Sequence, residues 1–356
     1  MMNKFTKLQI ILIGFLILTY NLSEAYIPQV GTVTLFEDDN GQTTTSTSQM
    51  TPNDEMTLLV QVFDEFDVIY GVNFYIWDGT TNSEKGTDTS IDHATYQWSK
   101  NDGWKLVGPL SSTWTIDKDN CKIATSTTGT GTLKLVFTPG KIARYQQNSD
   151  WKIKVVVCYT NQSQDVSGEI NISNAYYSEI NIDSQDAFFT SSFADTNDNP
   201  LTSPINLNII SNSNYILQIK AEDFIGENGG TISLPGPLGY ALTNTSSLQN
   251  TVTPTYQTMG TYPATSEQGA TQTLYLWLDY PVGQSPGTYN SQSYLATSDT
   301  QTTISLHGCI LTPSEKHLVL LLAPQFAVAG TVSEVFRLER QDEFNNPITK
   351  DSTAVI

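Results

Sequence analysis

The chain has 356 residues, and its 17 Lys and Arg against 36 Asp and Glu give a formal net charge of −19 at pH 7. A protein with this much negative charge repels phosphate backbones and anionic lipids. We therefore expect neither nucleic acid nor a membrane surface as a partner. Charged residues are only 15% of the chain, and Ser, Thr, Asn and Gln supply most of its polarity, which differs from charge-driven disorder. This length exceeds what one core supports and predicts two or three domains.

Residues 1–25 have the parts of a secretory signal peptide in the right order. Lys4 and Lys7 precede a mostly apolar run, and Ser23 and Ala25 stand at −3 and −1 of a cleavage point. The apolar run is shorter than the ~20 residues that a spanning helix needs. We therefore expect a secreted or cell-surface protein with no membrane segment apart from the signal peptide.

Residues 26–176 form the first predicted domain, which holds five of the six tryptophans. In "TLKLVFTPG", Leu133, Leu135 and Phe137 share one face, and the odd-numbered residues 151–159 do so in "DWKIKVVVCYT". Alternation with a period of two is typical of strands that are buried on one side. No segment shows the periodicity of an amphipathic helix, so the pattern predicts a β-sandwich.

An aromatic cluster in this domain has two interpretations. Tyr96, Trp98 and Trp104 are candidates for a carbohydrate-binding platform, because Trp and Tyr rings stack well and carry a polar group. The alternative is that these rings fill the sandwich core and that "NDGW", residues 101–104, closes a hairpin.

The three cysteines are Cys121, Cys158 and Cys309, and none lies in a metal-ligand spacing. In an exported protein, Cys121 and Cys158 can form a disulfide. Cys158 shares a strand face with two lysines, opposite the apolar side chains, so a lone thiol is equally consistent with the pattern. The sequence leaves both possibilities open.

Residues 177–305 form the second predicted module, in which Lys220 is the only Lys or Arg. "PINLNII" and "YILQIKA" each alternate apolar with polar residues and predict strands. "ISNSNYI" between their apolar positions predicts a tight turn that joins two antiparallel strands.

"DTNDNP", residues 195–200, offers a calcium-site candidate in Asp195, Asn197 and Asp198, since Ca²⁺ takes carboxylate and amide oxygens as ligands. The alternative is an Asx-rich turn before the next strand, because Asp and Asn bond to nearby backbone and tolerate left-handed conformations. No other cofactor is expected.

Residues 312–356 change to an apolar and then mixed-charge character. Ala329-Gly330, Asp342, Phe344 and Asn346-Pro347 follow an apolar strand in the order seen in prokaryotic surface repeats. This segment resembles the first strands of Ig-like repeats of the invasin and filamin-like kind, with Asn345 where those repeats commonly carry Gly. The two upstream modules are similar in style to β-sandwich domains of exported surface proteins.

The resemblance implies a partial, truncated Ig-like repeat at residues 312–356, since a whole sandwich takes about 100 residues. Its unpaired edge, with Val335, Phe336, Leu338 and Val355, would then promote self-association. The alternative is a small terminal hairpin that packs on the second module.

Together these features predict an all-β protein of tandem Ig-like antiparallel β-sandwich domains. We expect an exported structural or adhesive protein of the cell surface, whose partners are other surface or extracellular proteins or glycans. The alternative is a carbohydrate-binding module or part of a secreted glycosidase. The sequence contains no HExxH, GxSxG or comparable catalytic motif, so we do not expect an enzyme.

Overall fold

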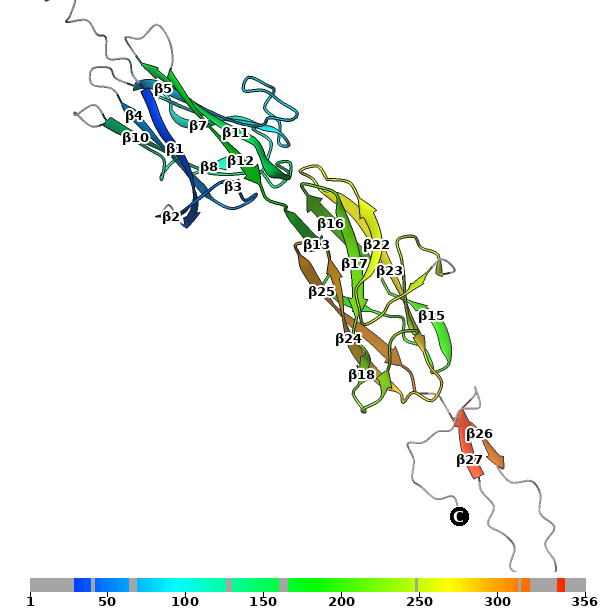
Figure 1. The fold of residues 1–356 in the computed structure, drawn as a ribbon. Helices are drawn as coiled ribbons and strands as arrows, with labels where there is room; N and C mark the ends of the chain where they lie inside the picture. The colour runs from blue at the N-terminus through cyan, green and yellow to red at the C-terminus, as the bar shows by residue number, and fades with distance from the viewer. Residues whose placement is uncertain are drawn as a thin grey trace, which may run out of the picture. The chain divides into compact units, whose positions relative to one another are not determined.

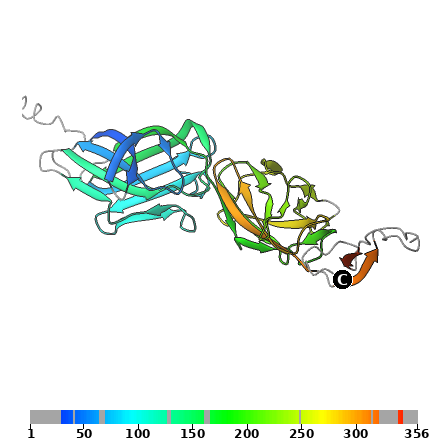
Figure 2. The ribbon, with the colours of Figure 1, turned by 90° about the horizontal axis from the view of Figure 1, so that it is seen from below.

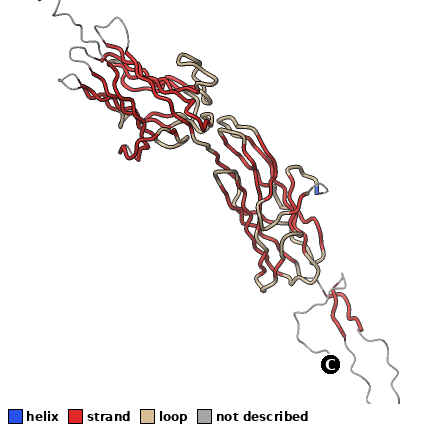
Figure 3. Tube along the Cα trace, in the orientation of Figure 1, coloured by secondary structure: helices blue, strands red, loops and turns tan. Residues whose placement is uncertain are grey.

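The computed structural model describes residues 29–39, 42–63, 69–125, 130–159, 166–246, 249–312, 315–320 and 338–342. Apart from a short 3₁₀ turn at Ser246, these residues form strands and loops, and none of them lies in an α-helix (Figure 3), so the protein is all-β. The predicted signal peptide lies outside the described residues, and within them no helix is long and apolar enough to cross a membrane. The chain divides into two compact units, Met1–Tyr177 and Ser178–Ile356.

Two mostly antiparallel sheets make up the first unit (Figure 1). The strands of one sheet are β1 (Gln29–Asp39), β2 (Gln42–Thr47), β4 (Met56–Phe63), β8 (Thr115–Ile116), β9 (Lys122–Thr125) and β10 (Thr130–Thr138). Those of the other are β3 (Gln49–Met50), β5 (Ile69–Asp78), β6 (His93–Ser99), β7 (Gly103–Gly108), β11 (Gln146–Tyr159) and β12 (Val166–Asn174). Their orders are β2-β1-β4-β10-β8, with β9 beside β10, and β3-β12-β11-β5-β6-β7.

The core of the first unit lies between these two layers, which Figure 2 shows from another side. Leu133, Leu135 and Phe137 on β10 are buried, as the alternation predicts. Trp114 and Trp151 lie with ring centroids 6.2 Å apart, and their indole N–H groups donate to backbone carbonyls at 3.1 and 2.9 Å. These hydrogen bonds let two large polar-tipped rings be buried without an unsatisfied donor.

Two further sheets make up the second unit. The strands of one are β13 (Ser178–Ile182), β15 (Thr196–Pro200), β16 (Ile205–Ser211), β20 (Leu238–Ala241), β21 (Asn250–Thr251) and β23 (Ala270–Tyr280). Those of the other are β14 (Asp186–Phe188), β17 (Tyr215–Ala221), β18 (Phe224–Gly226), β19 (Thr231–Ile232), β22 (Gln257–Tyr262), β24 (Gly287–Ala296) and β25 (Gln301–Ile310). Their main orders are β13-β16-β23-β20-β21 and β14-β25-β24-β17-β22.

The strands β16 and β17 occur where the sequence predicts them, but the connection between them differs from the prediction. β16 pairs with β13 and β23, whereas β17 pairs with β22 and β24 in the other sheet. The turn at residues 212–214 therefore crosses from one layer to the other, and the expected hairpin is wrong. Each strand turns its apolar face toward the same core. The alternation of apolar and polar residues is therefore the same whether the turn closes a hairpin or crosses between the two sheets.

In the second unit, the chain arrives at one end of the sandwich and leaves at the other. The Ser178 hydroxyl lies 2.5 Å from that of Thr297, in the turn between β24 and β25. From that turn β25 runs away to Ile310 at the opposite end. β14 follows β13 and pairs with β25 in parallel.

The first unit has the same arrangement. Gln29, at the start of β1, pairs with Phe63 at the end of β4. Asn174, at the end of β12, pairs in parallel with Met50, only a short turn before β4 begins at Met56. The first and last strands of each unit thus connect to the rest of the chain at opposite ends of a sandwich.

β25 continues to Ile310, beyond residue 305 where the sequence analysis ended the second module. After it, β26 (Glu315–Leu320) and β27 (Leu338–Asp342) form an antiparallel pair. Residues 321–337 and 343–356, which carry most of the predicted partial repeat, lie outside the described residues. The truncated repeat and its self-associating edge remain predictions.

Candidate functional site

The sheet β14-β25-β24-β17 has one face in the core and one face outside. On β24, Tyr289, Ser291, Ser293 and Leu295 are buried, so the alternate residues Asn290, Gln292 and Tyr294 lie on the outer face. On β25, Ile304 and Leu306 are buried, and the residues on its outer face are Thr303, Ser305 and His307.

The strand register arranges these outer residues in rows across the sheet. In one row, Ile225, Asn290, His307 and Phe188 are successive pairing partners on β18, β24, β25 and β14. In the next row, Gln292, Ser305 and Asp186 are partners, and the Glu222 N–H donates to the Gln292 carbonyl at 2.9 Å. Four separate segments therefore bring polar side chains to one surface.

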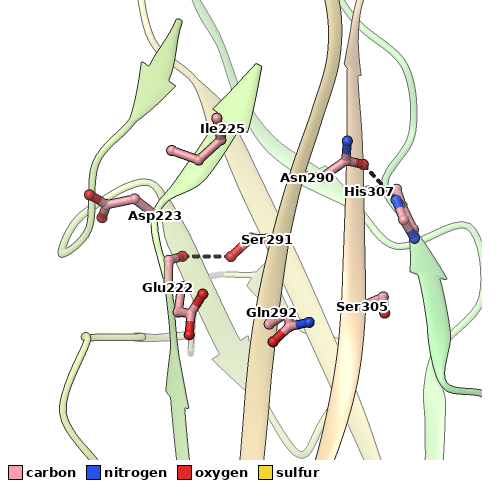
Figure 4. Close-up of a pocket in the computed structure, with 8 residues that line it drawn as sticks. All are labelled: Glu222, Asp223, Ile225, Asn290, Ser291, Gln292, Ser305 and His307. Atoms are coloured by element: carbon pink, nitrogen blue, oxygen red, sulfur yellow. Dashed lines mark hydrogen bonds between the residues drawn. The ribbon is translucent and has the colours of Figure 1, made fainter. Parts of the chain in front are cut away.

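Between these rows the surface is hollowed, with a volume of about 400 Å³ (Figure 4). One side is formed by Glu222, Asp223 and Ile225, which follow β17 and begin β18. The outward side chains of both rows on β24 and β25 line the rest. The hollow is open to solvent, and all of its lining residues except Ile225 carry a polar side chain.

Buried serines hold the strands beneath the hollow together. The Ser291 hydroxyl donates to the Glu222 carbonyl at 2.6 Å, and the Ser293 hydroxyl donates to the Lys220 carbonyl at 3.0 Å. Because both hydroxyls are largely buried, these bonds to main-chain acceptors replace water and fix the end of β17 against β24.

Hydrogen bonds orient the side chains of the first row. His307 Nδ1 lies 2.7 Å from Asn290 Oδ1, and Nε2 lies 3.4 Å from Asp186 Oδ1. The Phe188 ring stacks on the imidazole with centroids 4.7 Å apart. Since the amide oxygen of Asn290 accepts from His307, its amide nitrogen stays available as a donor.

Tyr294 connects the second row to a third. Its hydroxyl lies 2.7 Å from Glu222 Oε1 and 2.8 Å from Gln292 Oε1. The hydrogen bond to Glu222 raises the pKa of Tyr294. Next to it, the ammonium group of Lys220 lies between two aromatic rings, 4.7 Å from the Tyr294 centroid and 4.8 Å from that of Tyr256.

The structure does not support an exposed platform at the aromatic residues predicted from the sequence. Tyr96 is 0% exposed, with its ring 5.5 Å from that of Phe137 in the core of the first unit. Trp98 and Trp104 face each other across β6 and β7 and pack, partly buried, against the same core. The platform that includes Tyr96 is wrong, and the core interpretation explains the rings.

"NDGW" closes the β6–β7 hairpin, which is the alternative that the sequence offered. Ser99 pairs with Gly103, whose φ of 70° lies in the left-handed region that glycine adopts without strain.

Asp195, Asn197 and Asp198 lie at and within β15, at a bulge in its pairing with β23. Asp195 and Asp198 have φ of 65° and 55°, as Asp and Asn tolerate. The Asp198 N–H donates to Asp279 Oδ1 at 2.7 Å. Partial burial and the neighbouring Asp198 raise the pKa of Asp279. The left-handed φ angles and this hydrogen bond are what the alternative interpretation, an Asx-rich turn, predicts for residues 195–200.

Across the part of the chain that the structure describes, no group of three or more His, Cys, Asp or Glu side chains is placed to hold a metal ion. Calcium binding at the β15 segment therefore remains a prediction.

Cys121 and Cys158 are separate thiols, and the disulfide does not form. Cys121 is buried beside β10, where its sulfur accepts from the Val136 N–H at 3.2 Å, and burial raises its pKa to about 11. Cys158 lies on β11 of the other sheet, opposite Gly71. The two thiols thus belong to different layers of the sandwich.

The hollow of the second unit was not predicted from the sequence. The alternation in "YNSQSYLA" and "TISLHG" is a signal that Asn290, Gln292 and Tyr294 share a face, as do Ser305 and His307. It says nothing of which strands are neighbours, so the rows are visible only in the structure.

No protein-family model matches the chain, and no curated protein matches it. Among solved structures, a family 123 glycoside hydrolase from Clostridium perfringens is similar at 13% identity with a TM-score of 0.25, over 39% of this chain and 28% of that chain. The CupB6 tip adhesin from Pseudomonas aeruginosa is similar at 9% identity and a TM-score of 0.27, over 80% and 98%. The titin domains Z1Z2 in complex with telethonin are similar at 10% identity and a TM-score of 0.24, over 80% and 96%. At identities and TM-scores this low, the similarities do not show what this chain does.

Proposed function

We propose that this chain is an exported structural or adhesive protein of a prokaryotic cell surface, in which the two β-sandwich units act as spacers and binding modules. Its partners are other surface or extracellular proteins, or glycans. The proposed role involves no catalysis, because the sequence contains no recognisable nucleophile or metal-binding motif that a reaction would use.

The observation that carries the spacer role is the path of the chain through each unit. The chain arrives at one end of each sandwich and leaves at the other, so each unit holds the chain segments on its two sides apart by the length of its strands. Strands of about ten residues, at about 3.3 Å per residue, span roughly 33 Å.

The pairing of the last strand of each sandwich suits a protein that bears tension. In the second unit, β14 and β25 are parallel and are joined by bonds such as Ser305 N–H to the Gln185 carbonyl, at 2.7 Å. In the first unit, β3 and β12 are parallel, and Ser173 N–H donates to the Ser48 carbonyl at 2.9 Å. When the two ends of a unit are pulled apart, the force runs parallel to these strands. It therefore acts on all the hydrogen bonds of a pair at once, and no single bond breaks before the others.

Export is the part of the proposal that is easiest to test. The full chain, expressed with its own N-terminus, is separated into medium, surface and internal fractions, and intact cells are treated with protease. We expect the protein outside, or accessible to protease, with a mature N-terminus near Tyr26. The matched variant Ile13→Arg places a charge in the apolar run and should remain inside the cell. Wild-type protein that stays protected inside intact cells would contradict the proposal.

A further inference from the structure

We propose that the hollow on the outer face of β24 and β25 binds a neutral carbohydrate, held by Asn290, Gln292, Ser305 and Glu222. This inference deepens the proposed adhesive role, and it rests on that role for the presence of the ligand outside the cell. Three features of the hollow support the proposal: its mixture of hydrogen-bond donors and acceptors, the apolar side chains at its borders, and its negative charge.

The hollow offers donors and acceptors together. The amide nitrogen of Asn290 and the hydroxyl of Ser305 can donate, and the second carboxylate oxygens of Glu222 and Asp223 can accept. The Gln292 amide has one polar atom beside Tyr294, so its other polar atom remains for a ligand, whichever way the amide is turned. Sugar hydroxyls donate and accept at once, so they match this mixed set.

Neither kind of charged ligand matches the same groups. A cationic ligand uses acceptors only, so it would bury the donors Asn290 and Ser305 without partners, at a cost of about 1–3 kcal/mol for each unsatisfied group. An anionic sugar would meet Glu222, Asp223 and Asp186 on a chain with a net charge of −19. A neutral polyol avoids both costs.

Apolar surface borders the polar groups on two sides. Ile225 is 55% exposed and Phe188 is 54% exposed, and they stand at the two ends of the row that contains Asn290 and His307. Sugar rings carry C–H faces that pack against such side chains while their hydroxyls reach the polar groups between. A volume of about 400 Å³ is at the small end of small-molecule sites, which suits one or two sugar rings.

The base of the hollow is preorganised for binding. Ser291 and Ser293 fix β17 against β24, and His307 orients Asn290. A ligand therefore finds its partners already placed, and little side-chain entropy is lost on binding.

The test uses the purified full chain on an array of neutral oligosaccharides, followed by calorimetric titration with the best binder and with glucose, galactose, mannose and N-acetylglucosamine. Asn290→Ala and Gln292→Ala should each weaken binding by about tenfold or more. Gln218→Ala is the matched control, because Gln218 lies on the outer face of β17 but not in the hollow, and should change affinity by less than about twofold. All three positions lie on the surface, and thermal melts confirm that the variants fold.

Three results would overturn the proposal. The first is no binding of any neutral sugar up to about 10 mM. The second is sugar binding that Asn290→Ala and Gln292→Ala leave unchanged, which would place the site elsewhere. The third is binding of a lysine-rich peptide but of no sugar, with loss of that binding in Glu222→Gln. Because the purified chain is used, each failure would leave export and the spacer role standing, and a failure of export would not alter these titrations.

Discussion

A pair of tyrosine-to-phenylalanine substitutions should change stability in opposite directions. Tyr96 is wholly buried, and its hydroxyl has no hydrogen-bond partner among the described residues. An unsatisfied buried hydroxyl costs about 1–3 kcal/mol, and phenylalanine keeps the ring and its contact with Phe137. Tyr96→Phe should therefore raise the free energy of unfolding of the first unit by about 1 kcal/mol.

Tyr280→Phe in the second unit is the matched control. The Tyr280 hydroxyl donates to the Thr190 carbonyl at 3.2 Å and accepts from the Cys309 N–H at 3.1 Å. Removing it leaves both main-chain groups without this partner. We expect the free energy of unfolding of the second unit to fall by about 1–2 kcal/mol.

Urea unfolding of the full chain, followed by tryptophan fluorescence, measures both changes. Five of the six tryptophans belong to the first unit, and Trp277 reports on the second. The midpoint should move up for Tyr96→Phe and down for Tyr280→Phe, with unchanged slopes. If Tyr96→Phe destabilised the first unit by about 1 kcal/mol or more, its hydroxyl would have a partner in the core and the reasoning would be wrong.

Burial in the first unit leads to three further predictions. A thiol reagent at pH 8 should label Cys158 well before Cys121, whose pKa is raised by burial to about 11; equal rates would contradict the buried position. Gly140→Ala should lower the melting temperature of the first unit, at a cost of about 1–3 kcal/mol, because a Cβ there would lie 2.5 Å from the Trp114 indole; an unchanged melt would refute this contact. Burial raises the pKa of Tyr96, so the unfolded chain loses this proton above about pH 10 while the folded chain keeps it. Stability should fall above that pH, and less so in Tyr96→Phe; equal falls would contradict this cause.

The sequence predicts the strands well because each carries its own burial pattern. The apolar faces of β10, β16 and β17 follow directly from alternating residues such as Leu207, Ile209, Leu217 and Ile219. The crossing between β16 and β17 was not predictable in the same way. A turn of small polar residues suits both a hairpin and a step to the facing sheet, and only pairing with distant strands decides between them.

The candidate site was beyond sequence reasoning for a similar reason. Phe188, Ile225, Asn290 and His307 come from four strands, and the register of those strands places them in one row. At Tyr96 the sequence instead predicted a site that the structure does not contain. An aromatic ring with a polar group is equally typical of a sugar platform and of a core. The complete burial of Tyr96 on β6 decides between the two interpretations.

The spacer role is tested most directly by stretching the full chain between handles at its two ends in a single-molecule force experiment. We expect separate unfolding peaks for the two units, because the last strand of each sandwich, β12 or β25, must shear from its parallel partner, β3 or β14, before that sandwich opens. Opening of residues 178–312, at about 3.6 Å per residue and less the roughly 33 Å that the folded sandwich already spans, should release on the order of 450 Å of chain. Smooth extension without force peaks, or a unit that opens at negligible force, would contradict the account.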